Sequence, residues 1–151
     1  MKRESDPASR PRATRLASVM PFTIDQANRT LPLVRRIVAD IVETYERWQN
    51  EVRAFELAAV GPNAAEPGGL ARTHEREAQR LATEIEGFVG ELEALGLEFK
   101  GYDIGLVDFP SRIGDRPVYL CWRLGEPAVQ YWHETDGGFA GRQPIDALAT
   151  A

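Results

Sequence analysis

Residues 105–142 read GLVDFPSRIGDRPVYLCWRLGEPAVQYWHETDGGFAGR, and this stretch decides the fold. Turn signals at Gly114-Asp115 and at 125–127 interrupt a run that is rich in Val, Leu, Tyr, Phe and Trp. Short apolar runs separated by such turns are typical of an antiparallel meander. We therefore predict three strands, at 104–112, 117–124 and 128–134, and a further edge strand within 97–102.

The predicted strands carry different chemistry on their two faces, because successive side chains of a strand point to opposite sides. One face is almost wholly apolar: Val107, Phe109, Val118, Leu120, Trp122, Leu124, Ala128 and Trp132. The other face collects Leu106, Asp108, Tyr119, Cys121, Arg123, Val129, Tyr131 and His133. The unusual polar residues of the chain should therefore lie together on one side of the sheet.

The preceding residues predict a helical hairpin. From Val34 to Ala59 the apolar residues recur in alternating steps of four and three, and the same spacing returns from Ala78 to Leu95 after a loop rich in Gly and Pro. Thr23 and Gln26 have the spacing of a capping box at a helix start. Pro32 disfavours helical geometry at the residue before it, so we expect a short helix at 24–30 and a new one from Pro32.

Additional apolar residues tell which end of the hairpin meets the sheet. Leu33, Ile37 and Val42 lie beside the seam early in the first helix, and Val89 lies late in the second. We therefore predict an α+β fold: a long antiparallel helical hairpin packed at one end on a three- to four-stranded antiparallel β-meander. The other end, around Trp48, Phe55 and Gly61, should project, and we expect a homodimer through this tip.

Composition places the chain among single-domain proteins. Its 151 residues are 43% hydrophobic, enough for one core. We expect one domain at 21–146, a disordered basic tail at 1–20 and a frayed C-terminus at 147–151. The net charge of −5 argues against nucleic-acid binding, and no apolar run reaches the roughly 20 residues of a membrane helix. A single cysteine suits a reducing compartment, so we expect a cytoplasmic protein.

The polar face is the first candidate for function, and two interpretations of it stay open. In the first, the face is covered and its polar groups satisfy one another, with Asp108 paired to Arg123 as a diagonal neighbour. In the second, it is a shallow pocket under the 135–142 loop that holds a small anionic ligand. The candidate ligand-binding residues are Asp108, Tyr119, Arg123, Tyr131, His133 and Arg142.

Metal binding and catalysis receive less support from the sequence. The turns set a register in which Asp108 and His133 lie two strands and two residues apart, about 12 Å at the backbone. Because metal–ligand bonds are about 2 Å long, we expect no metal site and no cofactor. Cys121 lies in the middle of a strand, where free cysteines are usually small buried hydrophobes. His133 is the only catalytic candidate, as an acid or base with an acidic partner. Glu126, which lies in a turn, could pair with Arg142.

Four sequence blocks resemble a known family. The chain has the FT-x-x-x-A-N-x-x-LP pattern at 22–32, GLVDFP at 105–110, LCWR-x-GE at 120–126 and YWHE at 131–134. In these blocks it resembles the bacterial domain-of-unknown-function family two-two-zero-three, over about residues 21–145. This resemblance implies that the C-terminal block is the defining feature of the family, and it implies no activity.

Three functions follow from these observations as expectations. The first is a soluble binding or scaffold domain, without catalytic activity, that holds a small anionic ligand or a partner segment at the polar face. The second is a small enzyme that uses His133. The third is a structural coiled-coil interaction protein in which the sheet only caps the hairpin.

Overall fold

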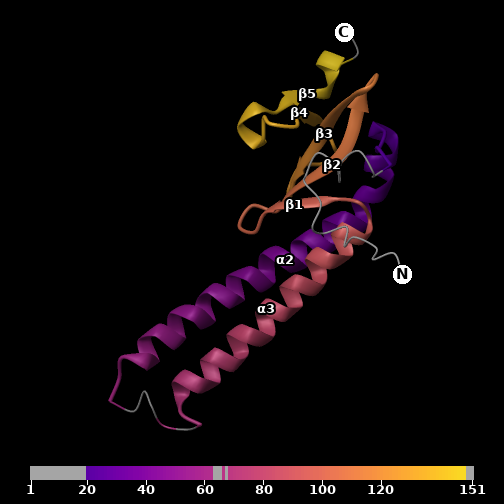
Figure 1. Ribbon diagram of the computed structural model, residues 1–151. Coiled ribbons are helices and arrows are strands. Elements are labelled where there is room, and N and C mark those ends of the chain that lie inside the picture. The colour runs from indigo at the N-terminus through magenta and orange to yellow at the C-terminus, as the bar shows by residue number, and fades with distance from the viewer. Residues whose placement is uncertain (1–19, 63–65, 67, 149–151) are drawn as a thin grey trace, which may run out of the picture.

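Two long antiparallel helices and a small sheet make up the protein in the computed structural model, which describes residues 20–62, 66 and 68–148. The helices project from one end of the sheet (Figure 1). The elements are α2 (Ile24–Ala59), α3 (Leu70–Ala94), β1 (Glu98–Gly101), β2 (Leu106–Ile113), β3 (Arg116–Arg123), β4 (Tyr131–Glu134) and β5 (Gln143–Pro144), with short 3-10 helices η2 (Phe139–Gly141) and η3 (Ile145–Leu148).

The sheet is an antiparallel meander in the order β1-β2-β3-β4-β5, so every strand pairs with its neighbour in the chain. Asp108 on β2 lies opposite Cys121 on β3, and Tyr119 on β3 lies opposite His133 on β4. The predicted α+β hairpin and meander are confirmed, and so is the edge strand within 97–102. The two residues of β5 add a fifth strand beside β4.

The first helix is continuous, and the predicted break at Pro32 is wrong. The capping box is present: Thr23 Oγ1 accepts from the backbone N–H of Gln26, and Gln26 Oε1 accepts from that of Thr23. Pro32 then lies inside α2, although a proline within a helix costs about 3 kcal/mol. The helix persists because Leu31 and Val34, on either side of the proline, are buried in the core.

One side chain attaches this first part of α2 to the sheet. Asn28 Oδ1 accepts from the backbone N–H of Val129 at 2.8 Å, and Asn28 Nδ2 donates to the carbonyl of the same residue at 3.4 Å. The bonds satisfy the backbone of a residue that has no strand partner. They therefore fix the connection between β3 and β4 against the helix.

The core lies between the apolar face of the sheet and the near halves of both helices. The buried cluster comprises Ala27, Leu31, Val34, Ile37, Val38, Ile41, Ile85 and Leu92 from the helices with Leu97, Val107, Phe109, Val118, Leu120, Trp122, Val129 and Trp132. The predicted packing end is therefore confirmed. Alternation fails at 128–130, where the chain forms no strand: Val129 enters the core and Ala128 is only half-buried.

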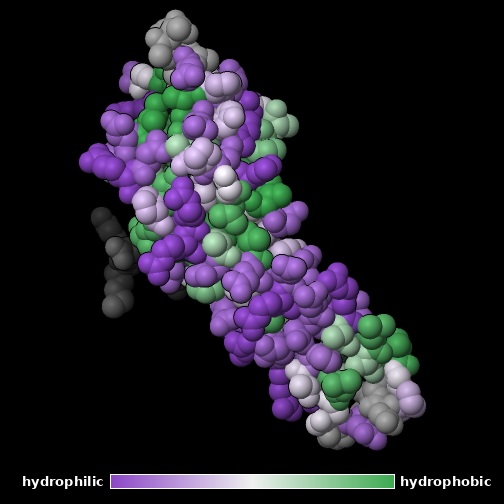
Figure 2. Space-filling view, turned by 180° about the vertical axis from the view of Figure 1, so that it is seen from behind, coloured by the Kyte–Doolittle hydropathy of each residue, from purple (hydrophilic) through white to green (hydrophobic). Residues whose placement is uncertain are grey.

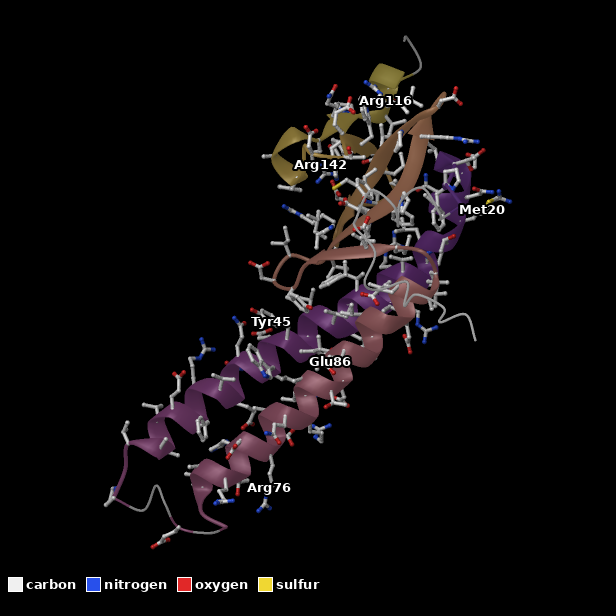
Figure 3. All side chains as sticks on the ribbon, viewed as in Figure 1. Met20, Tyr45, Arg76, Glu86, Arg116 and Arg142 are labelled. Atoms are coloured by element: carbon white, nitrogen blue, oxygen red, sulfur yellow. The ribbon has the colours of Figure 1, made fainter. Side chains whose placement is uncertain are left out.

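Beyond the core α2 and α3 pack along each other, and Tyr45 makes the last contact of α2 with the sheet end. Tyr45 lies on the side of α2 that faces β1 and contacts Tyr102 and Trp48, with ring centroids 5.3 and 5.6 Å apart (Figure 3). Farther out, His74 Nδ1 on α3 lies 2.6 Å from Glu51 Oε2 on α2. Trp48 thus finds partners within the chain.

Three large apolar side chains are exposed at the free end of the hairpin. Leu57 is 76% exposed, Val60 85% and Leu70 66%. Figure 2 shows hydrophobic surface gathered at this end, opposite the sheet. We call these three residues the tip patch. Trp48 and Phe55, which the sequence predicts to project at the tip, are both half-buried.

Residues 1–19 of the tail predicted at 1–20, and the last three residues of the predicted frayed end, lie outside the described residues. Within the described part of the chain, no helix is long and apolar enough to cross a membrane.

Candidate functional site

Three strands bring an acid, a thiol and an imidazole together on the face of the sheet away from the helices. Asp108 comes from β2, Cys121 from β3 and His133 from β4. Their potential ligand atoms all lie within 4.8 Å of one another, and all three residues are buried. We call this set the polar centre. Its residues sit on hydrogen-bonded neighbouring strands, so the backbone fixes their relative positions.

The strand spacing predicted that Asp108 and His133 lie too far apart to share a ligand, and this prediction is wrong. The register between the strands is the expected one, with Asp108 and His133 two strands and two residues apart. Nevertheless, His133 Nε2 lies 2.9 Å from Asp108 Oδ1. The backbone separation misleads because both side chains lean along the same diagonal and meet above β3, which the twist of the strands favours.

His133 is held in one orientation. Its Nδ1 lies 2.6 Å from the backbone carbonyl oxygen of Glu134. A carbonyl can only accept, so Nδ1 carries a hydrogen and donates it. The other nitrogen, Nε2, therefore faces Asp108, and the ring of Tyr119 lies alongside at a centroid distance of 5.4 Å.

The thiol of Cys121 is protonated at neutral pH. Burial raises its pKa to about 12 from 9.0, and the negative charge of Asp108 adds to the effect. A nucleophilic cysteine needs the opposite shift, because the thiolate is the reactive form. In the arrangement that the structure shows, Cys121 is therefore not an activated nucleophile.

The polar face is covered, as the first interpretation expected, but its ion pair is a different one. Asp108 is 2% exposed, His133 1% and Tyr119 0%. Asp108 bonds to His133, whereas Arg123 is exposed, so the predicted pairing of Asp108 with Arg123 is wrong. The reason is cost: a buried carboxylate requires a buried partner, and Arg123 lies at the end of β3, where its charge can stay in water.

An ion pair between distant turns lies beside the centre. Arg142 Nη2 donates to both carboxylate oxygens of Glu126, at 2.8 and 2.6 Å, as the sequence suggested. The guanidinium lies 3.8 Å from the ring centre of Tyr131 and 4.9 Å from that of Phe139. Figure 3 shows Arg142 between the C-terminal segment and the sheet. Cation–π contacts and charge-assisted bonds thus attach this segment over β4.

Glu126 also accepts hydrogen bonds within the turn that follows β3. Its Oε1 accepts from the backbone N–H of Arg123 at 2.7 Å, and its backbone carbonyl accepts from Trp122 Nε1 at 3.0 Å. One residue therefore connects the end of β3, the largest core side chain and the C-terminal segment.

The six predicted ligand residues fall into two groups. Asp108, Tyr119 and His133 are buried at the centre. Arg123, Tyr131 and Arg142 form its outer rim, with Arg123 exposed and the other two half-buried. Two residues were missing from that set. The register already placed Cys121 opposite Asp108, which is the signal that could have added it. Glu126 was recognised only as a turn residue with Arg142 as one partner.

The fold and this site define a small α+β domain with a buried polar centre on its sheet. The chain belongs to DUF2203, a family described as uncharacterized conserved protein, which matches residues 21–145. No curated protein and no solved structure matches the chain.

Proposed function

We propose that the protein is a binding domain without catalytic activity that holds a small anionic ligand at the rim formed by Arg123, Tyr131 and Arg142. A single observation carries this proposal. Arg142 Nε is buried, and it has no hydrogen-bond partner among the residues that the structure describes. A buried donor left without an acceptor costs about 1–3 kcal/mol. A phosphate or carboxylate oxygen at this position would remove that cost.

The charges of the site favour an anion at the rim and disfavour one at the polar centre. Arg123 is an exposed cation on the strand next to Tyr131. Asp108, by contrast, would repel an anion from the polar centre. The ligand therefore approaches the rim from outside, and it reaches the buried Arg142 Nε once the side chains over this atom shift to admit it.

An enzyme fits these observations less well. The pKa of Cys121, raised to about 12 by burial, removes the obvious nucleophile. Both ring nitrogens of His133 already face an oxygen at hydrogen-bond distance, so a proton transfer to substrate would need a rearrangement. We also propose the cytoplasm as its location, where a free cysteine stays reduced.

Thermal shift with a panel of anions tests the proposal. Phosphate, sulfate, citrate and short dicarboxylates are added separately to the wild type, to Arg142→Lys and to Arg76→Lys. Lysine keeps the charge but has no Nε donor in that position, and Arg76 is an exposed residue far out on α3 (Figure 3). At least one anion should stabilise the wild type and Arg76→Lys but not Arg142→Lys. Equal shifts in all three proteins, or none with any anion, would contradict the proposal.

A homodimer through the tip patch is a separate proposal. Leu57, Val60 and Leu70 are large apolar side chains that are mostly exposed and gather at one end of the molecule (Figure 2), and exposed apolar patches mark interaction sites. An apolar patch is self-complementary, so two copies related by a two-fold axis can cover each other. Sedimentation equilibrium of the wild type and of a variant with polar residues at the tip tests this proposal.

A further inference from the structure

We propose that the polar centre is a zinc site in which Asp108, Cys121 and His133 supply the protein ligands. The three offer one carboxylate oxygen, one sulfur and one imidazole nitrogen. Zinc binds each of these donors, whereas magnesium and calcium take oxygen ligands. The site is distinct from the anion contact of Arg142, because it uses none of the rim residues.

The spacing of the donor atoms suits a tetrahedral ion. Zinc bonds of about 2.0 Å to nitrogen and oxygen and about 2.3 Å to sulfur place the ligand atoms roughly 3.3–3.5 Å apart. The three atoms of the centre already lie within 4.8 Å of one another. His133 Nε2 and Asp108 Oδ1, at 2.9 Å, would have to separate by a few tenths of an ångström. Side-chain rotations achieve such shifts without moving the strands.

The orientation of His133 is an independent observation that points to a metal. Histidine ligands of metals almost always donate their other ring N–H to a carboxylate, a backbone carbonyl or water. His133 does this: Nδ1 donates to the carbonyl of Glu134 at 2.6 Å. Because the carbonyl of Glu134 and the carboxylate of Asp108 both accept, Nε2 also carries a proton in the absence of metal and forms the ion pair with Asp108. A cation between the two atoms would replace that proton and bind the lone pair that it leaves on Nε2.

Charge balance makes the buried set favourable once the ion is present. An ionised Asp108, a thiolate at Cys121 and a neutral His133 together carry two negative charges, which Zn²⁺ cancels. A neutral assembly avoids the large cost of burying unpaired charge. On binding, the thiol and the imidazolium each release one proton to solvent, and sulfur–zinc and nitrogen–zinc bonds form with no change of oxidation state.

The coordination sphere needs a fourth donor besides these three. Within the residues that the structure describes, the cluster of His, Cys, Asp and Glu has three members. A water molecule in the fourth position completes a tetrahedron with three protein ligands.

The full-length chain, stripped of metal with a chelator, allows a direct test with zinc alone. Isothermal titration of the wild type should show one zinc per chain together with proton release, and zinc should raise Tm. Cobalt added in place of zinc should give the near-ultraviolet charge-transfer band of a thiolate–cobalt bond. This signal needs no variant and reports the sulfur ligand itself.

Variants identify the ligands. Cys121→Ser and His133→Gln should lower zinc affinity by more than about a hundredfold, since loss of an outer partner alone costs 10–100-fold. His74→Gln is the matched control, because His74 also faces a carboxylate but lies on the hairpin. Absence of stoichiometric zinc binding by the wild type would overturn the inference, as would a cobalt spectrum without the thiolate band or wild-type affinity in both centre variants. An anion shift that persists without zinc would leave the proposed function intact.

Discussion

The two ends of the molecule handle apolar and polar groups in opposite ways. At the sheet end, Trp122 and Phe109 are fully enclosed, and even the polar Asp108 and His133 are buried with partners. At the other end, the tip patch leaves large aliphatic side chains in water. Both ends belong to the same two helices. The difference teaches that a hairpin needs a third layer to close its core, and the sheet provides one at one end only.

The reactivity of thiols should show the largest contrast. With a pKa of about 12 instead of 9.0, Cys121 has roughly a thousandfold less thiolate at pH 8, and burial slows the reagent further. We expect DTNB to react with Cys121 at least about a thousandfold more slowly in the native, metal-free protein than in urea. An Arg76→Cys variant supplies the control, because its added thiol at an exposed position of α3, outside the tip patch, should react at the unfolded rate. Fast labelling of Cys121 in the native chain would show that the centre is open.

The second largest contrast between the two ends should be in the loss of stability when a large side chain is truncated. Trp122→Ala should lower the free energy of unfolding by about 3–5 kcal/mol, since it leaves a cavity between the sheet and α2. Leu57→Ala removes a side chain that is exposed in the single chain and should change the free energy of unfolding of the monomer by less than about 0.5 kcal/mol. Urea unfolding followed by circular dichroism measures both. Comparable losses in the two variants, at concentrations where the protein is monomeric, would mean that Leu57 is buried within the monomer.

A glycine marks where the sheet meets the hairpin. Gly105 has φ +71°, and a Cβ there would lie 2.8 Å from both Leu124 Cβ and Val38 Cγ1. We expect Gly105→Ala to cost about 2–4 kcal/mol, from left-handed backbone strain and overpacking together. Gly125→Ala, with φ +101° and no neighbour within 4 Å, should cost only the backbone part, about 1–2 kcal/mol. Equal losses of unfolding free energy in the two variants, measured by urea titration, would show that α2 and the sheet move apart to accommodate a Cβ at position 105.

Polar substitution at the tip should have the smallest effect on stability and a clear one on assembly. The double variant Leu57→Ser and Val60→Ser should stay within about 0.5 kcal/mol of the wild-type monomer. Sedimentation equilibrium should nevertheless show a dimer for the wild type and a monomer for the variant. Leu33→Ser, at an exposed position of α2 near the sheet, is the control and should remain dimeric. A monomeric wild type at all concentrations would refute the proposed dimer.

The sequence predicted what depends on periodicity. Two-residue alternation assigned Val107, Phe109, Leu120 and Trp122 to the core face, and the strands there are regular. It failed at Val129, where the chain after Pro127 is not extended into a strand. Alternation holds only while a ladder of backbone bonds enforces it.

The rest depended on tertiary packing, which periodicity does not encode. The local preference of Pro32 predicted a helix break, but α2 continues because Leu31 and Val34 on either side of the proline are buried in the core. The polar centre was rejected from backbone spacing, although the register was right, because side-chain direction brings His133 to Asp108. The exposed apolar residues at the tip were expected around Trp48 but lie at Val60 and its neighbours, because Trp48 stacks on Tyr45 within the chain.

The unbroken course of α2 has a mechanical consequence. Its 36 residues span about 54 Å at 1.5 Å per residue, and the same rod carries the Asn28 anchor at one end and Leu57 near the other. A turn of two degrees about the anchored end sweeps the far end through about 2 Å. A partner that binds the end of α2 near Leu57 would therefore also fix the orientation of the sheet relative to that partner.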